Sequence, residues 1–303
     1  MALENLAGKS IAGYRLLNRV GEGGTAEVYR AEHPARGASA FKVLRERLRS
    51  DPIVVKRFLR EAGYGSRVVH PGVVRTYDFG EADGLYYLAL EWAKGEPLAD
   101  FLHREGPIAP ADAVALTRQL ADALAAAHQA GIIHRDLKPE NIMYDPDTRT
   151  VKLLDFGIAR DAEQVEERLT RTGFFVGTLQ YVAPEALSGE LVDGRADIYS
   201  LAKILYYMLT GRHPHEGRSP RELFQQLLSG KPIPLSKASE DLTFAPALEA
   251  VVMKGLERHP GERQQTVTEF AEELEAALAE GRDEPKRGWL GALKNIVNKR
   301  SSE

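Results

Sequence analysis

Hydrophobic and polar positions divide the chain into a strand-rich first part and a helix-rich second part. In roughly the first 90 residues, β-branched and aromatic runs alternate with Gly and Asp, a pattern typical of short strands. The predicted strands cover 14–20, 27–32, 38–44, 73–79 and 85–92, and residues 54–64 have helical spacing. A turn is expected at 81–84, between the last two strands.

The spacing becomes helical after Gly95. The clearest predicted helix, 111–130, carries apolar residues three and four positions apart, and further helices are expected over 197–210, 246–257 and 267–278. We therefore predict an α+β chain, with a small β-rich unit over 11–94, a larger mainly helical unit over 95–279, and a linker and tail over 280–303. A crevice between two such units is a common ligand position.

Composition narrows the choice of function. The 303 residues are 43% hydrophobic and 28% charged, with a net charge of −4, so nothing favours nucleic-acid binding. The absence of cysteine excludes disulfides and a cysteine nucleophile. Residues 1–10 lack the apolar core of a signal peptide, and no uncharged apolar run approaches the ~20 residues that span a bilayer, so we expect a cytoplasmic protein.

A glycine-rich turn separates the first two predicted strands. Gly21, Glu22, Gly23 and Gly24 can bring backbone N–H groups close to phosphate oxygens, because glycine has no Cβ. The spacing also fits a dinucleotide fingerprint, but that motif needs a helix directly after the turn, and 28–31 is expected to be a strand. A plain hairpin turn is the remaining alternative for this segment taken alone.

Four further motifs follow the turn in a fixed order. They are Ala40-Phe41-Lys42, His134-Arg135-Asp136-Leu137-Lys138-Pro139-Glu140-Asn141, Asp155-Phe156-Gly157 and Ala183-Pro184-Glu185. Together with the glycine turn, over about residues 11–279, the chain resembles the eukaryotic-type (Hanks-type) Ser/Thr protein kinases, with a texture closest to the bacterial members. The resemblance implies the two-lobed protein kinase fold and transfer of the γ-phosphate of Mg-ATP, with Mn²⁺ as an alternative metal, to Ser or Thr hydroxyls of proteins.

The resemblance also implies roles for individual residues. Asn141 and Asp155 are expected to bind metal, Lys42 to hold the α- and β-phosphates and pair with Glu61, and Asp136 to accept the hydroxyl proton beside Lys138. The residues expected to surround adenine are apolar or belong to the segment that joins the lobes: Val28, Ala40, Met143, Leu90 as gatekeeper, and Glu91 to Ala93. His70, His128 and His134 are expected to be structural.

The segment between Asp155 and Glu185 is polar. The resemblance implies that Arg135, which precedes Asp136, pairs with a phosphate on this segment, so Thr170 and Thr172 are predicted autophosphorylation sites. The alternative is an acidic loop with incidental threonines. By resemblance, Gly177 and Thr178 belong to the substrate-docking floor, Glu185 forms a structural ion pair with Arg263, and Asp197 braces the catalytic loop.

Three features depart from the family pattern or remain outside it. Ala26 stands where a third glycine is usual, and we expect ATP binding to survive. Gly63 and Gly65 lie in the helix of Glu61, so we predict a loosely held helix and a higher basal activity in Gly65→Leu. The cationic cluster Arg45, Arg47, Arg49, Lys56, Arg57 and Arg60 is either a solvated face or a docking patch for an acidic partner.

The tail places five apolar residues on one helical face and basic residues around it. They are Trp289, Leu290, Leu293, Ile296 and Val297, flanked by Lys286, Arg287, Lys294, Lys299 and Arg300. Docking on the kinase or a partner, peripheral contact with a membrane surface, and disorder all remain open. Homodimerisation through the first lobe is also left open by the resemblance.

Three other functions compete with an active protein kinase. A pseudokinase scaffold is opposed by the intact Lys42, Asp136, Asn141 and Asp155. A small-molecule kinase of related fold is opposed by Lys138, the Ala-Pro-Glu segment and Gly177-Thr178. A dinucleotide enzyme is opposed by the predicted strand after the glycine turn.

Overall fold

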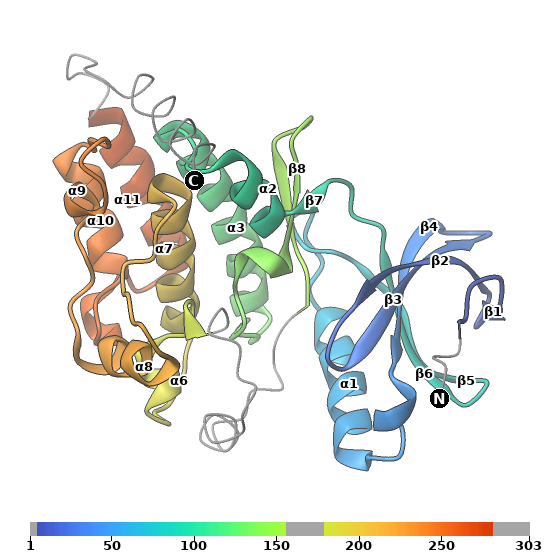
Figure 1. Ribbon diagram of the computed structural model, residues 1–303. Helices are drawn as coiled ribbons and strands as arrows, with labels where there is room; N and C mark the ends of the chain where they lie inside the picture. Colours follow the sequence, from blue (N-terminus) through green and yellow to red (C-terminus); the bar gives the residue numbers. More distant parts are fainter. Residues whose placement is uncertain (1–4, 156–178, 281–303) are drawn as a thin grey trace.

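The computed structural model describes residues 5–155 and 179–280, and these residues form two lobes (Figure 1). The small lobe holds a six-stranded antiparallel sheet in the order β1-β2-β3-β4-β6-β5. Its strands are β1 (Ser10–Ile11), β2 (Tyr14–Glu22), β3 (Ala26–His33), β4 (Gly37–Leu44), β5 (Thr76–Ala82) and β6 (Leu85–Glu91). A two-residue turn joins β5 to β6, with Asp83 and Gly84 both at positive φ (53° and 72°), the geometry that Asp-Gly favours in hairpins.

Each face of this sheet has its own apolar core. On one face, the ring of Phe41 lies 5.3 Å from that of Tyr14 and stacks at 5.1 Å on that of Tyr87. On the other face, α1 (Pro52–Gly65) buries Phe58 and Ala62 against the sheet. This helix starts two residues earlier than predicted, because the Asp51 carboxylate accepts hydrogen bonds from the N–H groups of Ile53 and Val54 at 2.9 and 3.3 Å.

The large lobe is built around the long helices α3 (Pro110–Gln129) and α7 (Arg195–Thr210). Around them lie α2 (Leu98–Glu105), α6 (Pro184–Leu187), α8 (Pro220–Ser229), α9 (Leu235–Ala238), α10 (Pro246–Gly255) and α11 (Val267–Glu280), with 3₁₀ turns η1 (Glu46–Leu48), η2 (Pro139–Asn141) and η3 (Pro260–Glu262) elsewhere in the chain. Fourteen of the sixteen residues of α7 are buried, so this helix is the centre of the lobe.

A second sheet lies where the two lobes meet. It consists of β7 (Glu96–Pro97), β8 (Ile142–Asp145) and β9 (Thr150–Leu153), in that order. Val73 pairs with Leu153 of β9 in an isolated parallel bridge. The strand predicted over 73–79 therefore begins only at Thr76, since its first residues pair with the large lobe. The strand-rich and helix-rich halves confirm the predicted two-lobed α+β architecture.

Candidate active site

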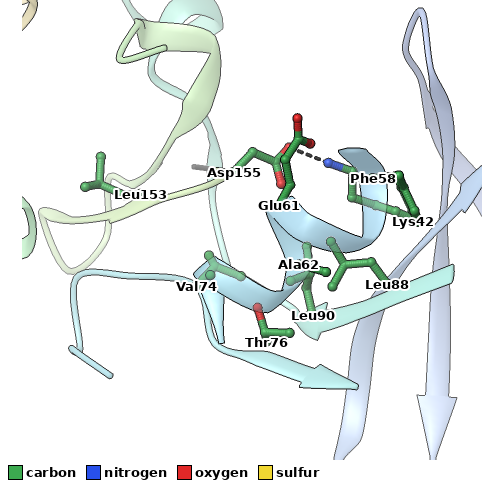
Figure 2. A pocket seen from close by; sticks show the side chains of 11 residues that line it. Lys42, Phe58, Glu61, Ala62, Val74, Thr76, Leu88, Leu90, Leu153 and Asp155 are labelled. Carbon is green, nitrogen blue, oxygen red and sulfur yellow. Dashed lines mark hydrogen bonds and ion pairs between the residues drawn. The ribbon is translucent and has the colours of Figure 1, made fainter. Parts of the chain in front are cut away.

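Lys42 and Asp155 meet between the lobes, in direct ion-pair contact (Figure 2). Lys42 lies on β4, and Asp155 follows β9 with a positive φ of 28°. Partial removal from water acts to raise the pKa of the Asp155 carboxyl. The adjacent Lys42 ammonium outweighs this effect and holds that pKa below its ordinary value. Asp155 is therefore ionised at neutral pH.

Glu61 projects from α1 toward the same pair (Figure 2). Lys42, Glu61 and Asp155 all line a cavity of about 30 Å³ whose walls include Gly65 and Leu90. Burial raises the pKa of the Glu61 carboxyl to about 7, and the charge of Lys42 offsets this only in part. The Lys42–Glu61 ion pair predicted from the sequence is absent among the described residues, because Lys42 pairs with Asp155 instead.

The loop after α3 brings three of the predicted catalytic residues together. The Asn141 side-chain amide donates to the Asp136 backbone carbonyl at 2.9 Å and to the Asp136 carboxylate at 3.1 Å. The Lys138 ammonium lies 3.2 Å from the same carboxylate. Asp136 is thus held as an acceptor beside a cation, an arrangement that can take a proton from a hydroxyl.

Asp197, on α7, braces this loop. Its buried carboxylate accepts hydrogen bonds from the backbone N–H groups of His134 (2.8 Å) and Arg135 (3.0 Å), and His128 lies 2.8 Å away. Arg135 has a positive φ of 62°, a conformation that costs free energy in a non-glycine residue and persists when neighbouring contacts enforce it. The bracing role predicted for Asp197 is confirmed.

The glycine turn between β2 and β3 is followed by a strand, as predicted, so the dinucleotide interpretation fails. The N–H of Gly23 donates to the carbonyl of Ala26 at 2.8 Å and closes the turn. Outside it, Arg45 pairs with Glu22, and the Arg47 guanidinium donates to the Gly24 carbonyl at 3.1 Å. No local sequence pattern indicates this role, because the arginines lie more than twenty positions from the turn.

The residues predicted to surround adenine occupy the strands that face the junction of the lobes. Val28, on β3, pairs with Lys42 on β4. Ala40, also on β4, pairs with Leu90 on β6 and packs in the same apolar cluster as Ala93. Met143, on β8, is half-buried.

Glu91, at the end of β6, is bound through both its backbone and its side chain. Its N–H donates to the Arg75 carbonyl at 2.8 Å, so this backbone N–H is already used within the chain. Its carboxylate accepts a hydrogen bond from the Arg75 N–H at 3.2 Å and pairs with Lys152, whose ammonium lies 2.5 Å away. No sequence pattern pointed to this pair, because its members lie on strands of different sheets.

The predicted metal ligands, Asn141 and Asp155, are brought near one another by a backbone hydrogen bond. The N–H of Leu154, the residue before Asp155, donates to the Asn141 carbonyl at 2.8 Å. Because the Asn141 amide nitrogen is used on Asp136, its oxygen remains as the hard ligand that Mg²⁺ or Mn²⁺ prefers. Within 5–155 and 179–280, no group of three or more His, Cys, Asp or Glu residues could hold a metal ion.

Two other predictions concern the segment after Asp155. The buried Glu185–Arg263 ion pair is confirmed, with bidentate contacts of 2.7 and 2.8 Å. Thr170, Thr172, Gly177, Thr178 and the tail 281–303 lie outside the described residues, so their predictions stay predictions. None of the helices that are described is both long and apolar enough to cross a membrane.

Comparison with known proteins identifies the family. The family model for the protein kinase domain matches residues 14–274, so the chain belongs to the protein kinase domain family. It is 39% identical over 287 residues to serine/threonine-protein kinase pkn3 of Myxococcus xanthus, and 41% identical over 266 residues to serine/threonine-protein kinase PknB of Mycolicibacterium smegmatis. These alignments cover 92% and 86% of the chain but 52% and 42% of the relatives, so it spans about half of their length.

A solved structure has the same fold. The crystal structure of the kinase domain of PknI from Mycobacterium tuberculosis superposes with a TM-score of 0.70 at 29% identity, over 89% of this chain and 98% of that one. The protein kinase fold predicted from the motifs is therefore confirmed.

Proposed function

We propose that this chain is an active Ser/Thr protein kinase that moves the γ-phosphate of ATP to hydroxyl groups of protein substrates. One observation carries the proposal. Asp136, Lys138 and Asn141 are bound to one another within 3.2 Å, and the Lys42–Asp155 pair lies one backbone contact away. A pseudokinase that kept only nucleotide binding would not need this acceptor and its cation.

In the proposed reaction the chain mainly positions charge. Lys42 holds the α- and β-phosphates, and the N–H groups of the glycine turn approach the phosphate oxygens. Asp136 accepts the proton of the substrate hydroxyl while the hydroxyl oxygen bonds to the γ-phosphorus. The bond between the γ-phosphorus and the oxygen that bridges to the β-phosphate breaks, and ADP is released. Lys138 balances the charge of the transferring group. Metal bound by Asn141 and Asp155 would neutralise further phosphate charge.

The Lys42–Asp155 contact implies a rearrangement when nucleotide binds. The contact engages one Asp155 oxygen, Oδ2, and a metal on the same carboxylate would compete with Lys42, which would then pair with the phosphates and with Glu61. We propose that the Lys42–Asp155 pair is the resting arrangement of the site, and that pairing with Lys42 lowers the pKa of Glu61 from its value of about 7.

The remaining parts of the proposal rest on the family resemblance. We place the two lobes at 11–94 and 95–279. We assign the activating phosphorylations to Thr170 and Thr172, with Arg135 as the receiving cation.

The test compares wild type with Asp136→Asn, in radiolabelled ATP and Mg²⁺, with and without a generic protein substrate. Asp193→Asn is the matched control, since Asp193 pairs with Arg195 away from the loop. We expect phosphoserine or phosphothreonine in wild type and control, and its loss in Asp136→Asn with ATP binding retained. If wild type binds ATP and transfers no label, the scaffold function is favoured instead.

A further inference from the structure

The large lobe holds a second cavity, separate from the residues of the proposed phosphoryl transfer. It has a volume of about 240 Å³ and lies between α6, α7, α8 and the segment that leads into η3. Pro184, Leu227 and Leu256 supply apolar wall, and Tyr199 and His215 line it as well. Figure 1 shows α6 and α8 next to one another beside the end of α7.

Two buried polar atoms of this wall lack a hydrogen-bond partner among the described residues. Tyr199 and His215 are 1% and 4% exposed, yet the Tyr199 hydroxyl and the His215 Nδ1 are unpaired within the described part of the chain. Buried polar groups in native proteins are normally satisfied by protein, by ordered water or by a ligand. Two such groups on one cavity therefore indicate that something polar occupies it.

Lys203 places an amine behind the same wall. It lies one helical turn after Tyr199 on α7, is fully buried, and its ammonium is 5.3 Å from the centre of the Tyr199 ring. Its Nζ likewise lacks a hydrogen-bond partner among the described residues. Burial without a compensating anion lowers the pKa of Lys203 to about 7. An anion in the cavity would offset the cost of charging this lysine.

The mouth of the cavity carries charges of both signs. Lys231, Arg258 and His259 are exposed there, and so are Glu257 and Glu262. The Tyr199 hydroxyl can donate a hydrogen bond into the cavity, His215 can donate from Nδ1 in one of its two tautomers, and an anion beside them would favour the charged form of Lys203 behind the wall. The interior therefore favours a negative group, and the mixed mouth would contact the rest of the molecule.

We propose that this cavity binds a small oxyanion-bearing ligand, a phosphate or a carboxylate, held by the Tyr199 hydroxyl and His215 and balanced by Lys203. The cavity lies against Pro184, next to Glu185, whose pair with Arg263 anchors the end of the segment after Asp155. A bound ligand would thus tie α6 to α8 and stabilise the large lobe.

The experiment measures thermal unfolding and binding calorimetry of the full chain at constant ionic strength, with inorganic phosphate and acetate as probes. All proteins carry Lys42→Met, so that the phosphate site of the nucleotide is weakened. Tyr199→Phe removes only the hydroxyl, and Lys203→Met replaces the buried ammonium by an apolar chain of similar length. Lys237→Met, which removes an exposed lysine, is the control.

We expect saturable stabilisation by phosphate or acetate, whichever group the site prefers, and at least fivefold weaker binding in Tyr199→Phe and in Lys203→Met but not in Lys237→Met. Lys203→Met should fold, because it removes an unpaired buried charge. Absence of saturable binding by both probes, or unchanged affinity in Lys203→Met and Tyr199→Phe, would overturn the proposal and leave a water-filled cavity.

Discussion

The Lys42 ammonium and the Asp155 carboxylate are paired directly across the space between the two lobes. This contact leaves Glu61 desolvated on α1 while Lys42, its expected partner, is bound elsewhere. The arrangement accounts for the raised pKa of the Glu61 carboxyl, because the cation offsets burial only in part.

Glu61→Gln should change how stability depends on pH. The folded pKa of Glu61, about 7, lies above the ordinary value of 4.5, so folded wild type keeps a proton that the unfolded chain releases between those values. Wild type therefore loses stability as pH rises from about 4.5 to 7, and Glu61→Gln should lack that loss. The difference between pH 5 and pH 7.5 should be on the order of 2 kcal/mol by urea denaturation. Identical pH profiles for the two proteins would contradict the raised pKa.

Removing one partner of the Glu185–Arg263 pair should be costly. Both side chains are buried, so Arg263→Met leaves an unpaired carboxylate inside the large lobe. The expected loss is about 3–5 kcal/mol, measured by chemical denaturation, and adding Glu185→Gln should recover part of it.

The control for this pair is Arg104→Met, which breaks the more exposed pair with Glu96. It should have a much smaller effect, because solvent screens exposed ion pairs. Equal losses of unfolding free energy in Arg263→Met and Arg104→Met would show that burial does not set the cost of breaking an ion pair here.

Asp197→Asn should impair catalysis more than folding. The amide keeps one acceptor oxygen, while the carboxylate serves the N–H groups of both His134 and Arg135. We expect kcat to fall at least tenfold and stability to fall by about 1–3 kcal/mol, since one buried N–H loses its partner. Steady-state kinetics with an unchanged kcat would argue against the bracing role, and Asp193→Asn again serves as control.

Arg45→Met and Arg47→Met should raise KM for ATP severalfold with a smaller change in kcat. Both arginines bind the glycine turn from outside, through Glu22 and the Gly24 carbonyl, so their loss should loosen the turn over the phosphates. Arg49→Met is the matched control, because Arg49 donates to the Leu44 carbonyl instead. If KM for ATP rises equally in all three variants, the rise comes from the loss of a positive charge and not from the contacts with the turn.

Filling the space beside Gly65 should raise basal activity. Gly65 is the last residue of α1, so its cost in helix propensity is smaller than at an interior position, and its missing side chain matters more. The adjacent cavity of about 30 Å³ suits a methyl group better than leucine, which makes Gly65→Ala the sharper variant. We expect a severalfold rise in the rate before any phosphorylation.

Gly63→Ala is the control for helix propensity, because its new Cβ would lie 3.8 Å from the Phe79 ring, an ordinary van der Waals contact. A rate that does not change in Gly65→Ala would contradict the idea that α1 is loosely held at this end.

The sequence by itself determined the architecture and the set of catalytic side chains. Alternating apolar residues defined β2, β3 and β4, helical spacing defined α3 and α11, and the motifs around Asp136 and Asp155 were continuous in the chain. Such signals are local, because strand periodicity, helix periodicity and the spacing within a loop each involve residues that are close together in the sequence.

Only the tertiary structure decided which of those side chains are paired and what lies between them. Val73 leaves the predicted strand to pair with Leu153, Lys42 contacts Asp155 in place of Glu61, and Tyr199 meets a cavity formed by three separate helices. These relationships join residues tens of positions apart. They depend on burial, on the charges that reach each group and on competition between partners, which no local pattern encodes.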